Sequence, residues 1–325
     1  MYLLGCETVS RPIYYRTVFD IPKEELLAPG HGLCGGCIAG TIIKLLLKVA
    51  GPNTIVVNAT GCVEVSTTTF PYTSWRVPYI HVAFENAAAV ASGIEAAIKI
   101  LQKKNIIDPS RKINIIAIGG DGATADIGFQ ALSGMLERGH RVMYLLYDNE
   151  AYMNTGIQRS GTTPLLAWTT TTPVGKVLKG KVQMKKPVSE IVAAHRIPYV
   201  ATANPAYFLD MMNKFKRSLN VDGPSFIHVI QPCTTGWRFD PRIGIKVARL
   251  ATETAMWINW ELDNGEFRVT VTVPKRKHVK HYIRIQGRFN HLTDDDIEAL
   301  QKYIDKEVDR VNKLVGKEVI GPVVE

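Results

Sequence analysis

The sequence lacks any apolar run of about 20 residues, the length that a helix needs to cross a membrane. It also lacks zinc-finger spacing, an aromatic RNA-binding motif and a helix-turn-helix signature, so nucleic acid is not expected as a partner. We therefore predict a protein with neither a membrane nor a nucleic acid among its partners. A cytoplasmic location follows from this interpretation, and cysteines there stay reduced and usually serve metal binding or catalysis.

The composition is that of an ordinary globular protein. Of 325 residues, 46% are hydrophobic and 21% are charged, and the net charge is +9. Basic residues are concentrated at 176–186 and 275–280. Each stretch can be a solvated face or a docking surface for an acidic protein or an anionic ligand.

Continuous apolar runs alternate with helical patterns along most of the chain. The runs at 54–58, 113–118, 141–147 and 225–230 predict buried strands, and 85–103 and 124–137 have helical periodicity. This alternation predicts an α/β fold with a doubly wound, mainly parallel sheet that is covered by helices on both faces. Ligands bind such sheets at the carboxyl ends of the strands.

The pattern changes after residue 237. We predict a helix at 243–257, an edge strand at 267–273 and an amphipathic helix at 294–314. We therefore divide the chain into a cofactor-binding domain, 1–237, and a C-terminal arm, 238–325, that packs on a partner subunit.

Four of the five cysteines could bind one metal centre. Cys34 and Cys37 form a CxxC pair, Cys62 follows the first predicted strand, and Cys233 follows the last of the apolar runs. Four thiolates are the usual ligands of an iron–sulfur cluster. The spacing alone also permits a thioredoxin-like pair, half of a zinc site or no metal. Cys6 is left over.

A Gly-Asp-Gly segment ends the predicted strand 113–118. Asp121 can give Mg²⁺ a carboxylate oxygen, Asn149 an amide oxygen and Ala151 a backbone oxygen, all hard ligands of the kind Mg²⁺ prefers. Gly122 permits a diphosphate to approach, and Gly120 and Ala123 are placed with it in the cofactor site. The segment alone could be a simple turn. The asparagine 28 residues after Asp121 gives the spacing of a thiamine diphosphate motif.

Taken together, these segments resemble the β subunits of pyruvate:ferredoxin oxidoreductases, within the 2-oxoacid:ferredoxin oxidoreductase family. The resemblance is carried in order by residues 28–37, 59–62, 81–88, 119–122, 147–156 and 232–237, with 286–289 in the tail. It implies a sheet of the thiamine-diphosphate-binding type. It also implies one 4Fe-4S cluster on Cys34, Cys37, Cys62 and Cys233, and Mg²⁺ on Asp121, Asn149 and the carbonyl of Ala151. Asn154 would lie beside the reacting end of the cofactor and act in catalysis, and Thr155 would lie near the diphosphate.

The resemblance further implies oxidative decarboxylation of pyruvate to an acyl-coenzyme A and CO₂, or the reverse, with electrons passing through the cluster to ferredoxin. The resemblance implies that an α subunit supplies a carboxylate to the thiamine and much of the substrate pocket. In this chain no residue is a convincing candidate for that carboxylate, and Glu64 and Glu85 are the two to be checked. The chain has no C-x₂-C-x₂-C-x₃-C-P run, so ferredoxin-like γ and δ subunits would carry the electrons away. Alternatives are another 2-oxoacid (2-oxoisovalerate, 2-oxoglutarate or oxalate), a non-redox thiamine decarboxylase subunit, and a zinc-stabilised binding subunit.

Overall fold

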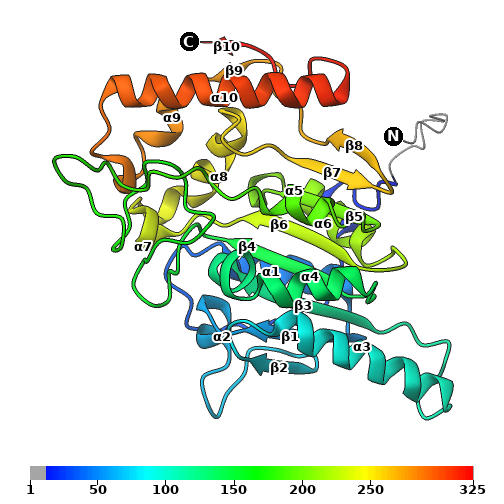
Figure 1. Cartoon of the computed structure of the whole chain (residues 1–325). Coiled ribbons are helices and arrows are strands. Elements are labelled where there is room, and N and C mark those ends of the chain that lie inside the picture. The colour runs from blue at the N-terminus through cyan, green and yellow to red at the C-terminus, as the bar shows by residue number, and fades with distance from the viewer. Residues whose placement is uncertain (1–11, 325) are drawn as a thin grey trace.

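The computed structural model describes residues 12–324, and Cys6 lies outside this range. Its centre is an eight-stranded sheet in the order β2-β1-β3-β4-β6-β5-β7-β8 (Figure 1). The first six strands in this order are parallel, and β7 and β8 continue the sheet as antiparallel strands. The predicted doubly wound, mainly parallel sheet is confirmed.

The strands of the parallel part are short and, except for the edge strand β2, almost entirely buried. Their bounds are β1 Thr54–Ala59, β2 Tyr79–Val82, β3 Asn114–Gly120, β4 Met143–Asp148, β5 Tyr199–Ala203 and β6 Ser225–Ile230. Every residue of β4, β5 and β6 is buried, which explains why these strands appear in the sequence as unbroken apolar runs.

Helices cover both faces of the sheet, because alternate strand residues point in opposite directions. Val56 and Leu145 face a core formed with α1 (Ala39–Ala50) and α6 (Phe208–Ser218). Val57 and Leu146 face the opposite core, formed with the helices α3 (Ala87–Lys103), α4 (Phe129–Glu137) and α5 (Val188–Ala193).

The C-terminal part both extends this sheet and adds a third core. Strand β7 (Trp260–Asp263) pairs with β5, and β8 (Glu266–Val269) pairs with β7, so β8 is the edge strand. The third core joins Trp237 to a set of helices: α8 Gly244–Glu253, α9 Lys280–Ile283 and α10 Asp294–Val315. The last strands, β9 Arg276–Lys277 and β10 Val323–Val324, form a separate pair.

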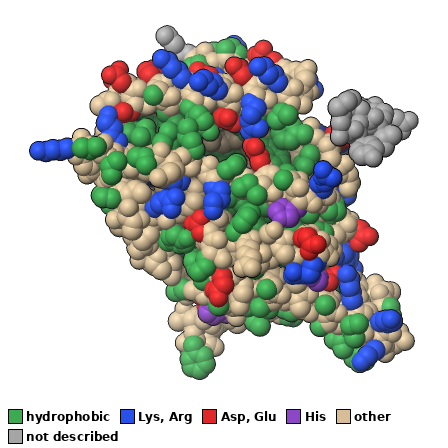
Figure 2. All heavy atoms as spheres, viewed as in Figure 1, with side chains coloured by type: hydrophobic (Ala, Val, Ile, Leu, Met, Phe, Trp, Pro, Cys, Tyr) green, Lys and Arg blue, Asp and Glu red, His purple; other side chains and the backbone are tan. Residues whose placement is uncertain are grey.

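Figure 2 shows this part from outside. Charged side chains lie along α10, and below it hydrophobic side chains border a hollow. A cavity of about 230 Å³ lies there, with walls from α5 and α10 and from residues 255–258. Among residues 12–324, no helix is long and apolar enough to span a membrane.

The structure differs from the predicted elements in detail at the ligand edge of the sheet. The helix predicted at 124–137 is divided into a π-helical turn, η2 (Gly122–Ile127), and α4. Cys62 does not end a strand: β1 stops at Ala59, and Cys62 opens a short helix, α2 (Cys62–Thr67). π-Helical turns often occur at functional sites. The remaining short turns are η1 Val18–Asp20, η3 Pro205–Tyr207, α7 Thr234–Trp237, η4 Pro241–Ile243 and η5 Gly287–Phe289.

Candidate functional site

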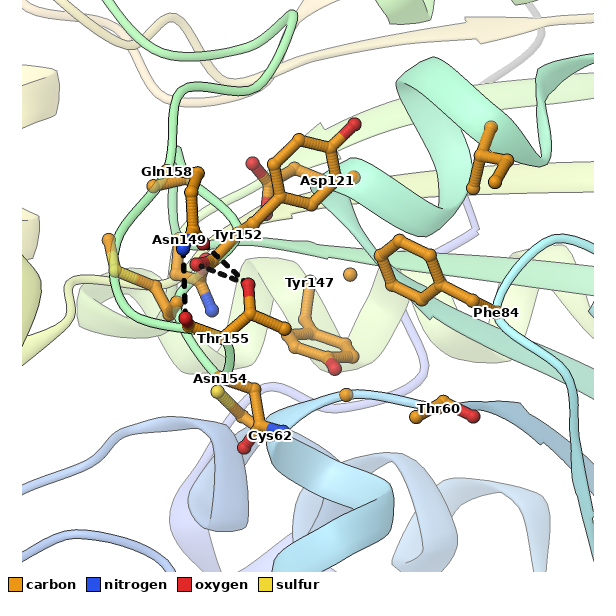
Figure 3. A pocket seen from close by; sticks show the side chains of 16 residues that line it. Thr60, Cys62, Phe84, Asp121, Tyr147, Asn149, Tyr152, Asn154, Thr155 and Gln158 are labelled. Carbon is orange, nitrogen blue, oxygen red and sulfur yellow. Dashed lines mark hydrogen bonds between the residues drawn. The ribbon is translucent and has the colours of Figure 1, made fainter. Parts of the chain in front are cut away.

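The residues predicted as ligands converge at the carboxyl edge of the parallel sheet. Asp121 follows β3, Asn149 follows β4, Cys62 follows β1 and Cys233 follows β6. In front of them lies a cavity of about 630 Å³. Figure 3 shows Asp121 and Tyr152 at one end of this cavity and Cys62 and Asn154 at the other. Its lining comprises Thr60, Gly61, Cys62, Phe84, Gly120, Asp121, Gly122, Ile127, Tyr147, Asn149, Ala151, Tyr152, Met153, Asn154, Thr155 and Gln158.

Three polar groups meet in one corner of the cavity. One side-chain amide atom of Asn149 lies 3.0 Å from Asp121 Oδ1 and 2.8 Å from the backbone oxygen of Ala151. If this atom is the amide nitrogen, it donates a hydrogen bond to both oxygens. If it is the amide oxygen, three oxygens converge on one point, as the ligands of a hard cation do. All three residues are buried, so the corner is preformed.

A buried charge network lies behind this corner. Asp148 Oδ2 is 2.8 Å from both Lys185 Nζ and His228 Nε2, and Lys185 Nζ is also 2.6 Å from Glu150 Oε1. Burial alone would raise the pKa of Asp148, but the charge of Lys185 and the hydrogen bond from His228 hold it below its ordinary value. Burial and the negative charge of Asp148 raise the pKa of Asp121 well above its ordinary value.

Thr162 joins the two carboxylates. Its Oγ1 lies 2.8 Å from Asp148 Oδ1 and 3.1 Å from Asp121 Oδ2. A hydroxyl has a single proton, so it donates to one carboxylate at a time. The surroundings of the two carboxylates therefore differ: Asp148 forms an ion pair with Lys185, whereas burial and the negative charge of Asp148 act most strongly on Asp121.

The residues predicted for the cofactor mostly line the cavity. Gly120, Gly122, Asn154 and Thr155 do so, whereas Ala123 is buried and absent from the lining. The hydroxyl of Thr155 donates to Gln158 Oε1 at 2.5 Å, and Gln158 Nε2 returns a hydrogen bond to the carbonyl of Thr155 at 2.8 Å (Figure 3). These bonds close the loop that presents Asn154.

The four cysteines line a second, smaller cavity of about 220 Å³. Cys34 and Cys37 approach it through a tight turn in which the Cys37 amide donates to the Cys34 carbonyl at 2.9 Å. Gly36 makes this turn possible, because its φ is +74° and a Cβ atom would lie 2.6 Å from the Pro241 oxygen. All four of the cysteines predicted as ligands, Cys34, Cys37, Cys62 and Cys233, therefore line the same cavity.

Two of the four sulfurs, those of Cys37 and Cys233, accept hydrogen bonds. The amide of Gly236 donates to Cys233 Sγ at 3.3 Å, and the side-chain amide of Gln231 donates to Cys37 Sγ at 3.7 Å. Burial raises the pKa of Cys37 to about 11 and that of Cys62 to about 12. Thiolates are therefore disfavoured here unless positive charge is bound among them.

The two cavities adjoin. Cys62, Asn149, Met153 and Asn154 line both of them. Gly236 leaves room for Met153 in this position, since a Cβ atom there would lie 2.2 Å from the Met153 sulfur. A group in the large cavity would thus be separated from the cysteines only by the width of these side chains.

Only one carboxylate, that of Asp121, is present in the lining of the large cavity. Glu64 is buried on α2, where it accepts a hydrogen bond from Thr68, and Glu85 is exposed, and neither lines the cavity. Within residues 12–324, no three His, Cys, Asp or Glu side chains are grouped closely enough to hold a single metal ion.

Sequence reasoning missed several members of the lining. Thr60, Phe84, Ile127, Tyr147 and Gln158 carry no metal-binding or acid–base signal, although Thr60, Phe84 and Tyr147 lie within segments that carry the resemblance. It also missed Lys185 and His228, whose importance depends on contacts between segments far apart in the chain.

Comparisons with known proteins identify the family of this chain. The profile of the thiamine pyrophosphate enzyme C-terminal TPP-binding domain matches residues 59–229, which contain Cys62, Asp121 and Asn149. The pyruvate synthase subunit PorB of Methanocaldococcus jannaschii is 58% identical over 92% of this chain and 99% of that protein. The ketoisovalerate oxidoreductase subunit VorB of Pyrococcus abyssi is 46% identical over 93% of this chain and 96% of its own length.

A solved structure shares the fold. The 2-oxoglutarate:ferredoxin oxidoreductase of Magnetococcus marinus superimposes with a TM-score of 0.54 at 19% identity, over 74% of this chain and 84% of that chain. The identity of the PorB relatives over almost their whole length is far stronger evidence of kinship. The chain therefore belongs to the 2-oxoacid:ferredoxin oxidoreductase family of thiamine pyrophosphate enzymes, as the resemblance in the sequence predicted.

Proposed function

We propose that this chain is the subunit of a pyruvate:ferredoxin oxidoreductase that binds thiamine diphosphate, Mg²⁺ and one 4Fe-4S cluster. The observation that carries the proposal is the wall shared by the two cavities, formed by Cys62, Asn149, Met153 and Asn154. A cofactor and a cluster on either side of this wall would be close enough for carbon chemistry to be followed directly by electron transfer.

The corner of the large cavity supports Mg²⁺ on Asp121, Asn149 and the carbonyl of Ala151. Three oxygens can converge there. Charge balance supports the same assignment. Lys185 and Arg288 compensate Asp148 and Glu150, whereas the strongest influences on the buried carboxylate of Asp121 are burial and the negative charge of Asp148. A divalent cation bridging to a diphosphate would supply the missing positive charge.

The cysteine cavity supports a cluster rather than zinc. A zinc ion holds four thiolates at about 2.3 Å, which leaves no space between them. In a 4Fe-4S cluster each thiolate binds a different iron, so the sulfurs stand apart around a volume. Cys34, Cys37, Cys62 and Cys233 surround about 220 Å³, and N–H groups are directed at their sulfurs as they are in protein-bound clusters.

The remaining residues would orient the reactants. Gly120, Gly122 and Thr155 line the cavity beside the proposed Mg²⁺ corner, where the diphosphate would lie. Ala123 is the next residue after Gly122 and is buried. Asn154 lies at the wall between the cavities and would face the substrate at the reacting carbon. When bound, thiamine diphosphate supplies the electron sink for decarboxylation, and the cluster supplies a one-electron acceptor.

Partners complete the proposed enzyme. Since Asp121 is the only carboxylate in the cavity lining, a partner α subunit would supply the second carboxylate and much of the substrate pocket. Ferredoxin-like γ and δ subunits would take the electrons to ferredoxin, and coenzyme A would accept the acyl group. Residues 238–325 would be the arm that packs on the α subunit. The VorB relative, at 46% identity, makes ketoisovalerate the second candidate substrate.

The test is to compare the purified chain with the chain reassembled with its partner subunits. We expect iron and broad absorbance near ~400 nm in the chain, since thiolate-bound iron absorbs there. Reduction of a viologen dye with pyruvate and coenzyme A should require the partners. Activity of the chain alone would contradict the proposed role of the α subunit. Faster turnover of ketoisovalerate than of pyruvate by the assembled enzyme would favour the second substrate.

A further inference from the structure

The loop that carries the proposed Mg²⁺ ligands is held at three consecutive residues. Asp148 contacts Lys185 and His228, and the carbonyl of Asn149 accepts a hydrogen bond of 2.7 Å from Trp237 Nε1. Glu150 Oε2 lies 2.6 Å from Arg288 Nη2, a charge contact whose angle is not that of a hydrogen bond. Glu150 has a φ of +67°, which a non-glycine residue keeps only where its surroundings hold it.

Arg288 reaches this loop from the far end of the chain. It is only 2% exposed, and its guanidinium carbon lies 3.8 Å from the centre of the Trp237 ring. Trp237 closes α7, the helix that begins immediately after Cys233. One guanidinium group therefore contacts both the loop of Asn149 and the helix that follows a cysteine of the second cavity.

The segment that presents Arg288 is fixed by its own backbone. The amide of Gly287 donates to the carbonyl of Arg238 at 3.0 Å, and the carbonyl of Arg288 accepts from the amide of Trp168 at 3.0 Å. A Cβ atom on Gly287 would lie 2.7 Å from Cβ of Arg238, so the segment is pressed directly against the residue that follows α7. Phe289, only 1% exposed, anchors the segment in the third core.

We propose that Arg288 is a positioning residue that fixes the Asn149 loop relative to the Cys233 helix, and thereby the spacing of the two cofactor sites. The planar guanidinium can stack on Trp237 and contact Glu150 at the same time, whereas a lysine ammonium could satisfy only the charge. Lys185 can be compared with Arg288, because it is also a cation behind the loop. Its two ion pairs, with Asp148 and Glu150, both lie beside Asn149, so Lys185 does not link the loop to α7. The identities of the cofactors rest on the proposed function, but these contacts do not.

The first test measures hydrogen exchange in the full-length chain without cofactors, comparing wild type with Arg288→Met, Arg288→Lys and Lys185→Met. Arg288→Met should speed exchange in both 148–152 and 233–239. Lys185→Met should speed exchange only in 148–152. In Arg288→Lys, which keeps the positive charge, exchange should rise less in 148–152 than in 233–239. Arg284→Met is the matched control, since Arg284 is partly exposed and pairs with Asp294, and it should change neither segment.

The second test measures Mg²⁺-dependent binding of thiamine diphosphate and the EPR spectrum of the reduced iron centre. Loss of Arg288 should weaken Mg²⁺ binding by about 10- to 100-fold, as loss of residues behind metal ligands does. It should also alter the EPR spectrum, which Lys185→Met should leave unchanged. If Arg288→Met fails to fold, Arg288→Lys takes its place: it keeps the positive charge near Glu150 but loses the planar group that stacks on Trp237, so exchange should rise at 233–239 more than at 148–152.

Unchanged exchange at 233–239 in Arg288→Met would overturn the proposal, and so would equal effects of Arg288→Met and Lys185→Met on both segments. A wild-type chain that binds neither thiamine diphosphate nor iron would refute the proposed function instead. The exchange experiment would then still decide the role of Arg288.

Discussion

The ring of Tyr152 lies directly over Gly122, where a Cβ atom would be 1.8 Å from Cε1 of the ring. The hydroxyl of Tyr152 is fixed by a hydrogen bond of 2.8 Å to Asp126 Oδ2, at the end of the same π-helical turn that Gly122 opens. The ring therefore covers the backbone next to Asp121 and forms one wall of the large cavity. The glycine after Asp121 is required by this contact, in addition to any role in approaching a diphosphate.

We expect Gly122→Ala to destabilise the chain by about 1–3 kcal/mol, the usual cost of overpacking a tight contact. It should also weaken thiamine diphosphate binding, because the ring must move within the cavity. Thermal unfolding and calorimetric titration measure the two effects. Gly93→Ala is the control, since Gly93 lies in α3 with no atom within 4 Å of a Cβ position.

Adding Tyr152→Ala to Gly122→Ala should recover most of the lost stability, because the clash partner is gone. If the double variant is no more stable than the sum of the two single changes predicts, the two positions are not coupled and the Tyr152 ring is not the reason for the glycine.

The sequence predicted much of the fold because burial on both faces leaves a clear signal. The strands β3, β4 and β6 are continuous apolar runs, and each is found within a few residues of its predicted place. The π-helical turn was not predictable, since no local pattern in its residues distinguishes it from the start of the helix predicted at 124–137.

The site was predictable to the extent that its residues follow strands. Asp121 and Asn149 share one edge of the sheet because both come after neighbouring parallel strands, β3 and β4. Lys185 and Arg288 were not predictable, because no local pattern indicates which distant carboxylate a basic residue will contact.

If the proposed cluster is bound, replacing Cys62 with serine should abolish its EPR signal in the reduced state and lower the iron content, while the chain remains folded. Cys62 opens α2 at the wall shared by both cavities, and a hydroxyl is a far poorer iron ligand than a thiolate. Cys6→Ser is the control and should retain the full signal. An unchanged spectrum in Cys62→Ser would exclude Cys62 as a ligand.

Asp121→Asn should weaken thiamine diphosphate binding mainly by weakening Mg²⁺ binding. The substitution keeps the shape of the side chain but removes the negative charge that a hard cation requires. A titration of cofactor at several Mg²⁺ concentrations should show partial recovery at high Mg²⁺. Asp108→Asn, at an exposed turn, should bind normally. Unaltered affinity in Asp121→Asn would show that Asp121 only shapes the turn.

Glu95 on α3 should make the stability of the chain sensitive to acid. Burial alone would raise the pKa of Glu95, but Lys99 at 2.5 Å, His140 at 3.0 Å and the amide of Arg141 lower it below its ordinary value. Because the folded-state pKa is the lower one, this stabilisation is present at neutral pH and is lost as the pH falls through that pKa.

Glu95→Gln should therefore cost about 1–3 kcal/mol at neutral pH, the range for hydrogen bonds to a charged group. Denaturant unfolding at several pH values should show the difference from wild type shrinking towards acid pH. A difference independent of pH would mean that packing, rather than the charge of Glu95, provides the stabilisation.

Lys181 should be needed to hold the loop at 161–163, which lies behind the proposed Mg²⁺ corner, although Lys181 itself contacts no proposed ligand. It is 1% exposed, and its ammonium donates to the carbonyls of Gly161 at 2.9 Å, Thr163 at 2.5 Å and Met184 at 3.3 Å. Between the first two carbonyls lies Thr162, whose hydroxyl reaches Asp121 and Asp148. Lys181 therefore fixes the position of a side chain that touches both carboxylates.

Lys181→Met keeps the aliphatic stem but leaves these carbonyls without their donor. We expect a loss of at least about 2 kcal/mol, since each unsatisfied buried acceptor costs roughly 1–3 kcal/mol. We also expect weaker Mg²⁺-dependent cofactor binding, because Thr162 is released. Lys176→Met, at an exposed position of the same basic stretch, should change neither property. If both variants behave like wild type, the buried lysine only fills space, and Thr162 must be held by its bonds to the carboxylates alone.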